Sequence, residues 1–141
     1  VGKVITVNAT VSGAEGGCQA ECGAAAAMAS AAIVEMLGGT PEMALDAASI
    51  SLKNIMGLVC DPIAGLVESP CSKRNASGVV NALISAEMAL AGIKSVIPFD
   101  EVVEAMYIIG KDMHSDYKET AKGGIAGTPT GIKIKENIKN I

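Results

Sequence analysis

Four cysteines are the residues of this sequence best suited to chemistry, and three of them occupy similar local positions. Cys18 follows a Gly-Gly pair, Cys60 precedes an Asp-Pro pair and Cys71 follows a Ser-Pro pair, so each is expected near the start of a helix. Unpaired N–H groups and the helix dipole at such a position favour a thiolate over a thiol. Thiolates ligate iron and zinc, which makes these three cysteines candidate metal ligands.

Cys22 is one helical turn beyond Cys18, inside an alanine-rich stretch, where burial as a small apolar side chain explains it better than metal binding. Burial is also the alternative for the other three, because cysteine is among the most often buried residues. Their spacing matches neither the paired CxxC motifs of zinc sites nor the CxxCxxC run of ferredoxins, so spacing alone leaves both interpretations open. Disulfides are disfavoured, because no signal peptide is recognisable and apolar residues are plentiful.

A helical bundle is predicted to position the cysteines, and the expected fold class is all-α. Glycine and proline delimit about four long helices, at residues 19–37, 41–56, 70–91 and 100–111, with a short helix between Cys60 and Cys71. The two ends are expected to be irregular: residues 4–7 predict a short strand or an extended arm, and residues 123–131 predict a loop. Residues 1–131 would form one domain, followed by a mobile Lys-rich tail at residues 132–141.

The composition limits the classes of function. The chain has 141 residues, enough for one domain with a core, and its formal net charge of −4 argues against nucleic-acid binding. Aromatic residues make up only 2% of the chain, so small aliphatic side chains must pack helix against helix. The most apolar run, residues 22–34, is short and bounded by glutamates, which favours a buried helix over a membrane span. We therefore expect a cytoplasmic protein that does not bind membranes.

Four segments together resemble the iron–sulfur L-serine dehydratases. Residues 17–21 (GCQAE) look like the GCQxE signature of that family, and residues 57–67 (GLVCDPIAGLV) resemble its second cysteine segment. Residues 70–76 (PCSKRNA) resemble the third, and residues 112–124 resemble a later run around His114. These matches follow the order of the family over roughly residues 10–131, and the chain is similar to the later part of the α subunit or catalytic domain.

The resemblance implies a lyase of amino-acid degradation and gluconeogenesis, which converts L-serine to pyruvate and ammonia without pyridoxal phosphate. The family uses a four-iron, four-sulfur (4Fe-4S) cluster held by three cysteines, which correspond here to Cys18, Cys60 and Cys71. Cys22 is left out of this ligand set. One iron then has no protein ligand and can act as a Lewis acid toward the hydroxyl of serine, while a base removes the α-proton.

Five residues are candidate substrate contacts. Ser72, Lys73, Arg74 and Asn75 follow Cys71 in the first turns of a helix, where a carboxylate is favoured and arginine offers bidentate binding. His114 is the only histidine of the chain and lies in the family-like segment 112–124. The alternative is that Lys73 and Arg74 face solvent or pair with the cluster, and that His114 is a surface residue at a helix end. The general base stays unassigned.

The resemblance also implies the partners: L-serine as substrate, a β subunit or β domain, and an oligomeric enzyme. The upstream segments of the family do not occur in this sequence, so we expect the isolated chain to be inactive. Two alternatives stay open at this point. One is a related cluster-dependent cysteine desulfidase, and the other is a non-catalytic iron–sulfur or scaffold subunit.

Overall fold

The chain folds into a bundle of α-helices, in a computed structural model that describes residues 1–139 and has no strand in that range. Its α-helices are α1 (Gly2–Asn8), α2 (Gly13–Gly16), α3 (Cys18–Met36), α4 (Pro41–Asn54), α5 (Cys71–Leu90), α6 (Phe99–Asp112) and α7 (Pro129–Lys139). Three 3₁₀-helices lie in the connections: η1 (Ile63–Gly65), η2 (Ser115–Tyr117) and η3 (Gly124–Gly127). The predicted all-α fold is confirmed. Within the described range, no helix combines the length and the apolarity needed to cross a membrane.

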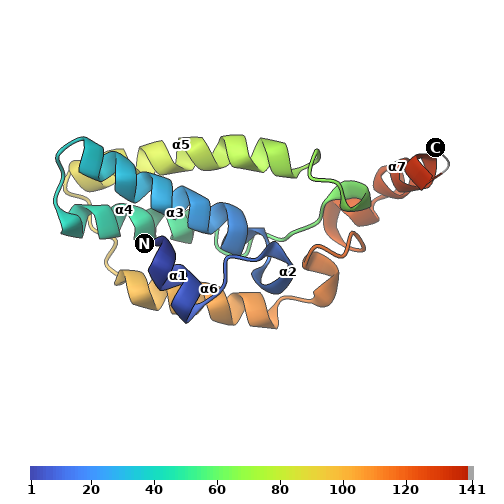
Figure 1. Cartoon of the computed structure of the whole chain (residues 1–141), viewed down its shortest axis with the longest axis horizontal. Helices are drawn as coiled ribbons and strands as arrows, with labels where there is room; N and C mark the ends of the chain where they lie inside the picture. Colours follow the sequence, from blue (N-terminus) through green and yellow to red (C-terminus); the bar gives the residue numbers. More distant parts are fainter. Residues whose placement is uncertain (140–141) are drawn as a thin grey trace.

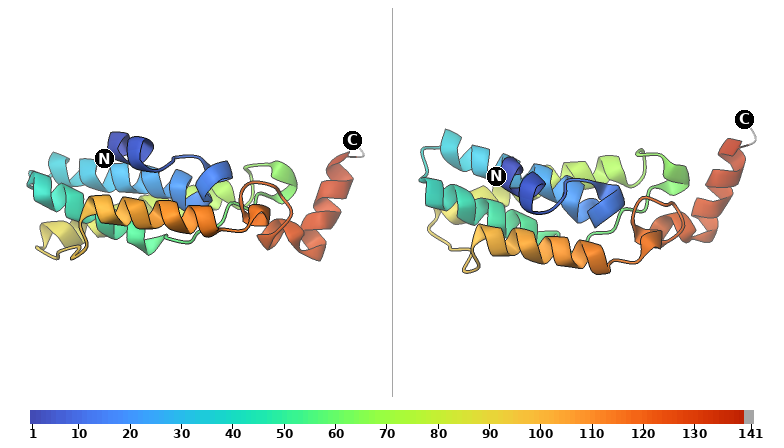
Figure 2. Two further views of the ribbon diagram at one scale, coloured as in Figure 1. Left: turned by 90° about the horizontal axis from the view of Figure 1, so that it is seen from below. Right: turned by 60° about the horizontal axis from the view of Figure 1, so that its bottom comes forward.

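The four long helices α3, α4, α5 and α6 form the bundle, and α3 packs against each of the other three (Figure 1). Helices α3 and α5 run in the same direction, whereas α4 and α6 run back alongside them. Helices α3 and α5 therefore begin at the same end of the bundle, where the loops 55–70 and 113–128 also gather (Figure 2). We call this end the cysteine end, because Cys18 begins α3 and Cys71 begins α5.

Small side chains allow the helices to approach closely. Alanines of α3 are buried in one cluster with Leu52 of α4 and Met106 of α6. Farther from the cysteine end, Val34 of α3 packs with Ala47 of α4 and Ala86 of α5. Close helix-on-helix packing by small aliphatic residues is thus confirmed.

The prediction of a strand or extended arm at residues 4–7 is wrong, because these residues belong to helix α1. Ile5 is fully buried in the cluster that contains Met106, whereas Val4 and Val7 are exposed. The β-branched residues favour a strand locally, but the burial of Ile5 against distant parts of the chain decides the conformation. Tertiary packing of this kind routinely overrides β-propensity.

The last part of the chain is more helical than the sequence suggested. The expected loop at residues 123–131 contains η3 and the beginning of α7. Thr128 Oγ1 accepts a hydrogen bond from the Gly131 N–H, and Pro129 is the first residue of α7, which is the same Thr-Pro start signal that begins α4. The expected Lys-rich tail is helical as far as Lys139, and residues 140–141 lie outside the described residues.

Two glycines inside helices are expected to respond in opposite ways to replacement by alanine. A Cβ on Gly110 of α6 would lie 2.9 Å from the Cα of Gly16 in α2, so Gly110→Ala should lower the free energy of unfolding by about 1–3 kcal/mol. A Cβ on Gly78 of α5 would meet only the Cβ of Ala26 at 3.9 Å, so Gly78→Ala should raise it by about 0.5–1 kcal/mol. Urea unfolding of both variants measures the difference, and equal effects would contradict the close contact between α2 and α6.

Candidate functional site

The four cysteines meet at the cysteine end. Cys18, Cys22 and Cys60 form one buried cluster, in which the Cys18 Sγ donates to the Cys22 Sγ at 3.3 Å. Cys71, at the first residue of α5, lines a cavity of about 370 Å³ together with Cys22 and Cys60. The structure therefore brings together the three cysteines that the sequence singled out, and it places Cys22 beside them.

The backbone around Gln19 positions Cys18. The Gln19 N–H donates to the Leu58 carbonyl at 2.9 Å, and the Gln19 Oε1 accepts from the Gly57 N–H at 2.8 Å. The Gln19 Nε2 donates to the carbonyl oxygens of Gly16 and Met106, which lie in α2 and α6. The residue after Cys18 thus joins the start of α3 to the loop that leads to Cys60.

Cys60 lies in an extended segment rather than at the start of a helix, so the sequence-based placement of this residue is wrong. Its N–H donates to the Tyr117 carbonyl and its carbonyl accepts from the Glu119 N–H, both at 2.8 Å, in an isolated parallel bridge with Lys118. The expected short helix between Cys60 and Cys71 exists as η1, which spans only three residues. A backbone pairing between segments so far apart in sequence leaves no local signal.

The electrostatics of the thiols also differ from the expectation. Burial is the main cause that raises the pKa of Cys18 to about 12 and the pKa of Cys60 to about 12. Burial likewise raises the pKa of Cys22 and of Cys71. The predicted preference for thiolates at helix starts is therefore outweighed by desolvation, and without a bound cation the four groups are thiols at neutral pH.

Cysteine thiols are the soft metal-binding groups at this cavity. Among residues 1–139, no group of three or more histidine, cysteine, aspartate or glutamate side chains stands where it could hold one metal ion. The cysteines instead border a cavity, with Cys18 buried directly against Cys22 and Cys60. These donors are of the kind that iron–sulfur clusters use, so the residues present fit such a group chemically.

Two of the five predicted substrate contacts lie at this cavity. Ser72 and Asn75 line it. Lys73 does not, and its ammonium group donates to the Glu68 carbonyl. His114 does not line it either: 68% of its side chain is exposed, and its Nδ1 accepts from the Asp116 N–H at the start of η2. Arg74 does not line it and is paired with the Asp61 carboxylate. Whether any of the five residues binds substrate stays a prediction.

The expected anion site at the start of α5 is altered by the loop before it. The N–H of Ser72 donates to the Val67 carbonyl, and those of Lys73 and Arg74 both donate to the Pro70 carbonyl. These backbone donors are therefore not free, and side chains must supply the polar contacts of the cavity. The Asn75 Nδ2 donates to the Cys71 carbonyl at 3.0 Å, which holds the amide at the cavity wall.

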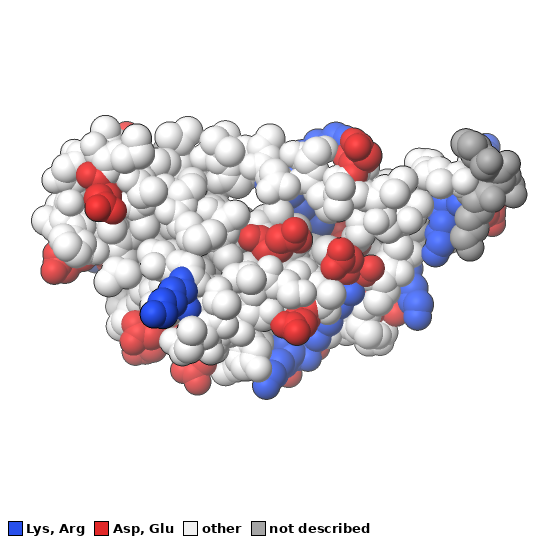
Figure 3. Space-filling model, in the orientation of Figure 1, with Lys and Arg blue, Asp and Glu red and all other residues white. Residues whose placement is uncertain are grey.

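Glu21 and Glu119 also line the cavity, and reasoning from the sequence did not identify either as a site residue. Glu21 lies one turn after Cys18 on α3, and this spacing could have indicated it. Glu119 reaches the cavity only through the pairing of its segment with Cys60. Figure 3 shows acidic side chains around α2 and the start of α5, whereas the surface over α3 is largely uncharged.

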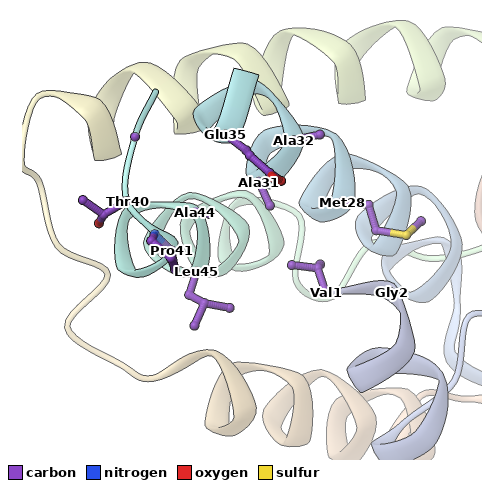
Figure 4. Close-up of a pocket in the computed structure, with 11 residues that line it drawn as sticks. Val1, Gly2, Met28, Ala31, Ala32, Glu35, Thr40, Pro41, Ala44 and Leu45 are labelled. Atoms are coloured by element: carbon purple, nitrogen blue, oxygen red, sulfur yellow. The ribbon is translucent and has the colours of Figure 1, made fainter. Parts of the chain in front are cut away.

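A larger cavity of about 700 Å³ lies elsewhere, between the N-terminus, α3 and the start of α4 (Figure 4). It is lined mainly by apolar residues such as Met28, Ala31 and Leu45, and Glu35 is its only ionisable side chain. It contains no cysteine and no set of metal ligands. The smaller cavity beside the cysteines is therefore the candidate functional site.

The comparisons with known proteins agree on one family. The model of the "Serine dehydratase alpha chain" family matches residues 1–126. The chain is 64% identical over 138 residues to an "L-serine dehydratase, alpha chain" of Peptoniphilus asaccharolyticus, covering 98% of this chain and 47% of that protein. It is 61% identical over 137 residues to a "Probable L-serine dehydratase, alpha chain" of Bacillus subtilis, covering 97% of this chain and 46% of the relative. It thus spans about half the length of these relatives.

The burial of the thiols predicts an order of chemical modification in the metal-free chain. Cys71 is only partly buried and Cys18 is 1% exposed, so iodoacetamide at about pH 8 should alkylate Cys71 first and Cys18 last. Because the pKa of Cys18 is raised from 9.0 to about 12, its alkylation should still accelerate as the pH rises above 9. Peptide mass spectrometry measures both, and in denaturant the order should vanish. Equal rates in the folded chain would contradict the buried arrangement.

Proposed function

The chain belongs to the serine dehydratase alpha chain family, and we propose that it forms the cluster-binding part of an enzyme that converts L-serine to pyruvate and ammonia. In this proposal Cys18, Cys60 and Cys71 hold a 4Fe-4S cluster. The main support is the convergence of these cysteines, from three separate segments, on one cavity that Ser72 and Asn75 also line. The family relationship supports the reaction, and the cavity supports the cluster.

The cysteines would bind the cluster as thiolates. Cys18 is held by the start of α3, Cys60 by its bridge to Lys118, and Cys71 by the first turn of α5. Because their pKa values are raised, each would lose a proton when the cluster binds, and the affinity should rise with pH. Held by these three residues, the cluster would supply a Lewis acid for the departure of the serine hydroxyl.

The remaining residues of the cavity would bind and orient L-serine. The Asn75 amide would offer its second N–H to the substrate carboxylate, on the α5 side of the cavity. The Ser72 hydroxyl already donates to the Glu68 carbonyl at 2.8 Å, so it offers the substrate an acceptor only. Glu21 and Glu119 offer negative charge for the substrate ammonium group. The carboxylate and the ammonium group of the substrate would thus contact different sides of the cavity. A β partner and an oligomeric assembly belong to this proposal too, since two of the relatives are named as alpha chains.

Serine replacements of single cysteines test the ligand set in the complete enzyme. Cys18→Ser, Cys60→Ser and Cys71→Ser should each lose the cluster and serine deamination, because a hydroxyl does not replace a thiolate as an iron ligand. Cys22→Ser is the matched control, since its Sγ lies 3.3 Å from that of Cys18, and it should keep both. Anaerobic reconstitution with iron and sulfide analysis, followed by pyruvate assays, measures the outcome.

Three results would contradict the proposal. Loss of iron from Cys22→Ser as complete as from Cys60→Ser would mean a fourth cysteine ligand, which leaves no open iron for the hydroxyl. Release of sulfide from L-cysteine without pyruvate formation from L-serine would instead indicate a cysteine desulfidase. A cluster without either activity would indicate a non-catalytic subunit.

The isolated chain is expected to be inactive even when a cluster has been reconstituted. It spans 47% of the Peptoniphilus relative and 46% of the Bacillus relative, so the enzyme that we propose would need further residues. Pyruvate formation from L-serine should be detectable for a full-length alpha chain with its partner and absent for these 141 residues. Comparable turnover by both preparations would refute this expectation.

A further inference from the structure

Asp61, the residue after Cys60, is a buried carboxylate that does not line the cavity beside the cysteines. Only 2% of it is exposed, and both of its oxygens accept hydrogen bonds. Oδ1 accepts from Nη1 of Arg74 at 2.6 Å, and Oδ2 accepts from the Ile125 N–H at 2.7 Å. A carboxylate this deeply buried is tolerated when a charged partner and hydrogen bonds replace its water.

Arg74 connects both neighbours of Cys60 to the helix that Cys71 begins. It lies one turn after Cys71 on α5, and its Nη1 donates to the Val59 carbonyl at 2.9 Å as well as to Asp61. The guanidinium is planar and its donors have fixed directions, so these contacts restrict where the Cys60 segment lies. The backbone of Cys60 is thus held to the first turns of α5 from both sides.

A third segment closes around the same carboxylate. Ile125 belongs to η3, and Gly124 before it adopts a φ of +60°. A Cβ on Gly124 would overlap the carboxylate of Asp61, so only glycine allows this approach. The Asp61 carboxylate therefore lies where the segment that carries Cys60, the start of α5 and η3 meet.

We propose that Asp61 and Arg74 are a positioning pair that holds Cys60 and Cys71 at the separation required by the cluster. This rests on the proposed function, because it takes both cysteines as cluster ligands. In this role Arg74 does not bind the substrate carboxylate, since both N–H groups of its Nη1 are bonded to Asp61 and Val59 and the residue does not line the cavity. Residues that orient metal ligands typically change metal affinity about 10–100-fold when they are replaced.

The test uses Asp61→Asn, Arg74→Gln and the double variant in the complete enzyme, reconstituted anaerobically. Each single variant should lower the affinity for the cluster by about 10–100-fold, seen as less iron and sulfide per chain at limiting supply. The cluster absorbance should also decay faster in air. The double variant should lose no more cluster affinity than either single variant, because the two residues act as one unit. Arg74→Lys keeps the charge and should recover part of the loss.

Asp46 provides the matched control. It also accepts from one cation and one backbone N–H, namely Lys94 Nζ at 3.2 Å and the Ser95 N–H at 2.8 Å, away from the cysteine end. Asp46→Asn should leave the iron content and the cluster lifetime at wild-type values. If Asp46→Asn loses as much iron as Asp61→Asn does, the effect of Asp61→Asn comes from general destabilisation of the fold, and the proposal is overturned.

Each remaining outcome also tests the positioning role of Asp61 and Arg74. Wild-type iron content and cluster lifetime in Asp61→Asn overturn the positioning role. Full iron content with a raised KM for serine in Arg74→Gln makes Arg74 a substrate contact instead. If circular dichroism shows that Asp61→Asn has lost helix, Arg74→Lys decides, and wild-type cluster affinity in that variant overturns the proposal. A wild-type enzyme that takes up no cluster refutes the proposed function itself, which separates that failure from failure of the pair.

Discussion

Close packing against α3 is the constraint on which the rest of the structure depends. Ala20, Ala24, Ala26 and Ala27 of this helix are buried. A Cβ on Gly23 would lie 3.0 Å from the Leu52 side chain, so this side chain of α4 packs directly on the backbone of α3. This spacing places α5 beside α3 in the same direction, which brings the starts of both helices, and therefore Cys18 and Cys71, to one end. Larger residues along α3 would move the two sulfurs apart, so the geometry of the site depends on a core that contains none of its chemistry.

Polar side chains, rather than the cysteines, hold the loops at that end. Gln19 fixes the loop before Cys60, and Asp61 fixes the loop after it through Arg74 and Ile125. Each buried polar group left without a partner would cost about 1–3 kcal/mol, and among the described residues no buried side-chain nitrogen or oxygen lacks one. A shift of the Cys60 segment would break several of these bonds together, so the segment has one well-defined position.

The long helices were predictable because their boundaries are local: Gly38-Gly39 ends α3 and Thr40-Pro41 begins α4. Helix α1 was not predictable in this way, since the burial of Ile5 depends on residues that are distant in sequence. At the site, the order of the cysteine segments was enough to propose three ligands, a set that the structure leaves as a prediction. The bridge between Cys60 and Lys118 and the bond between Asp61 and Ile125 join segments far apart in sequence, so no local pattern revealed them.

The hydrogen bonds around the cysteines also bear on how a cluster would be acquired. In small metal sites that fold only around their ion, binding must supply the free energy of ordering the ligands. Here Gln19 and Asp61 already order the segments that carry Cys18 and Cys60, through contacts that involve no sulfur. Binding would therefore not have to order the backbone. Its main opposing cost would be the removal of protons from thiols whose pKa burial has raised, and that cost falls as the pH rises. The hydrogen bonds thus preform a pocket of neutral thiols without any metal, and a cluster that bound there would replace the thiol protons with iron.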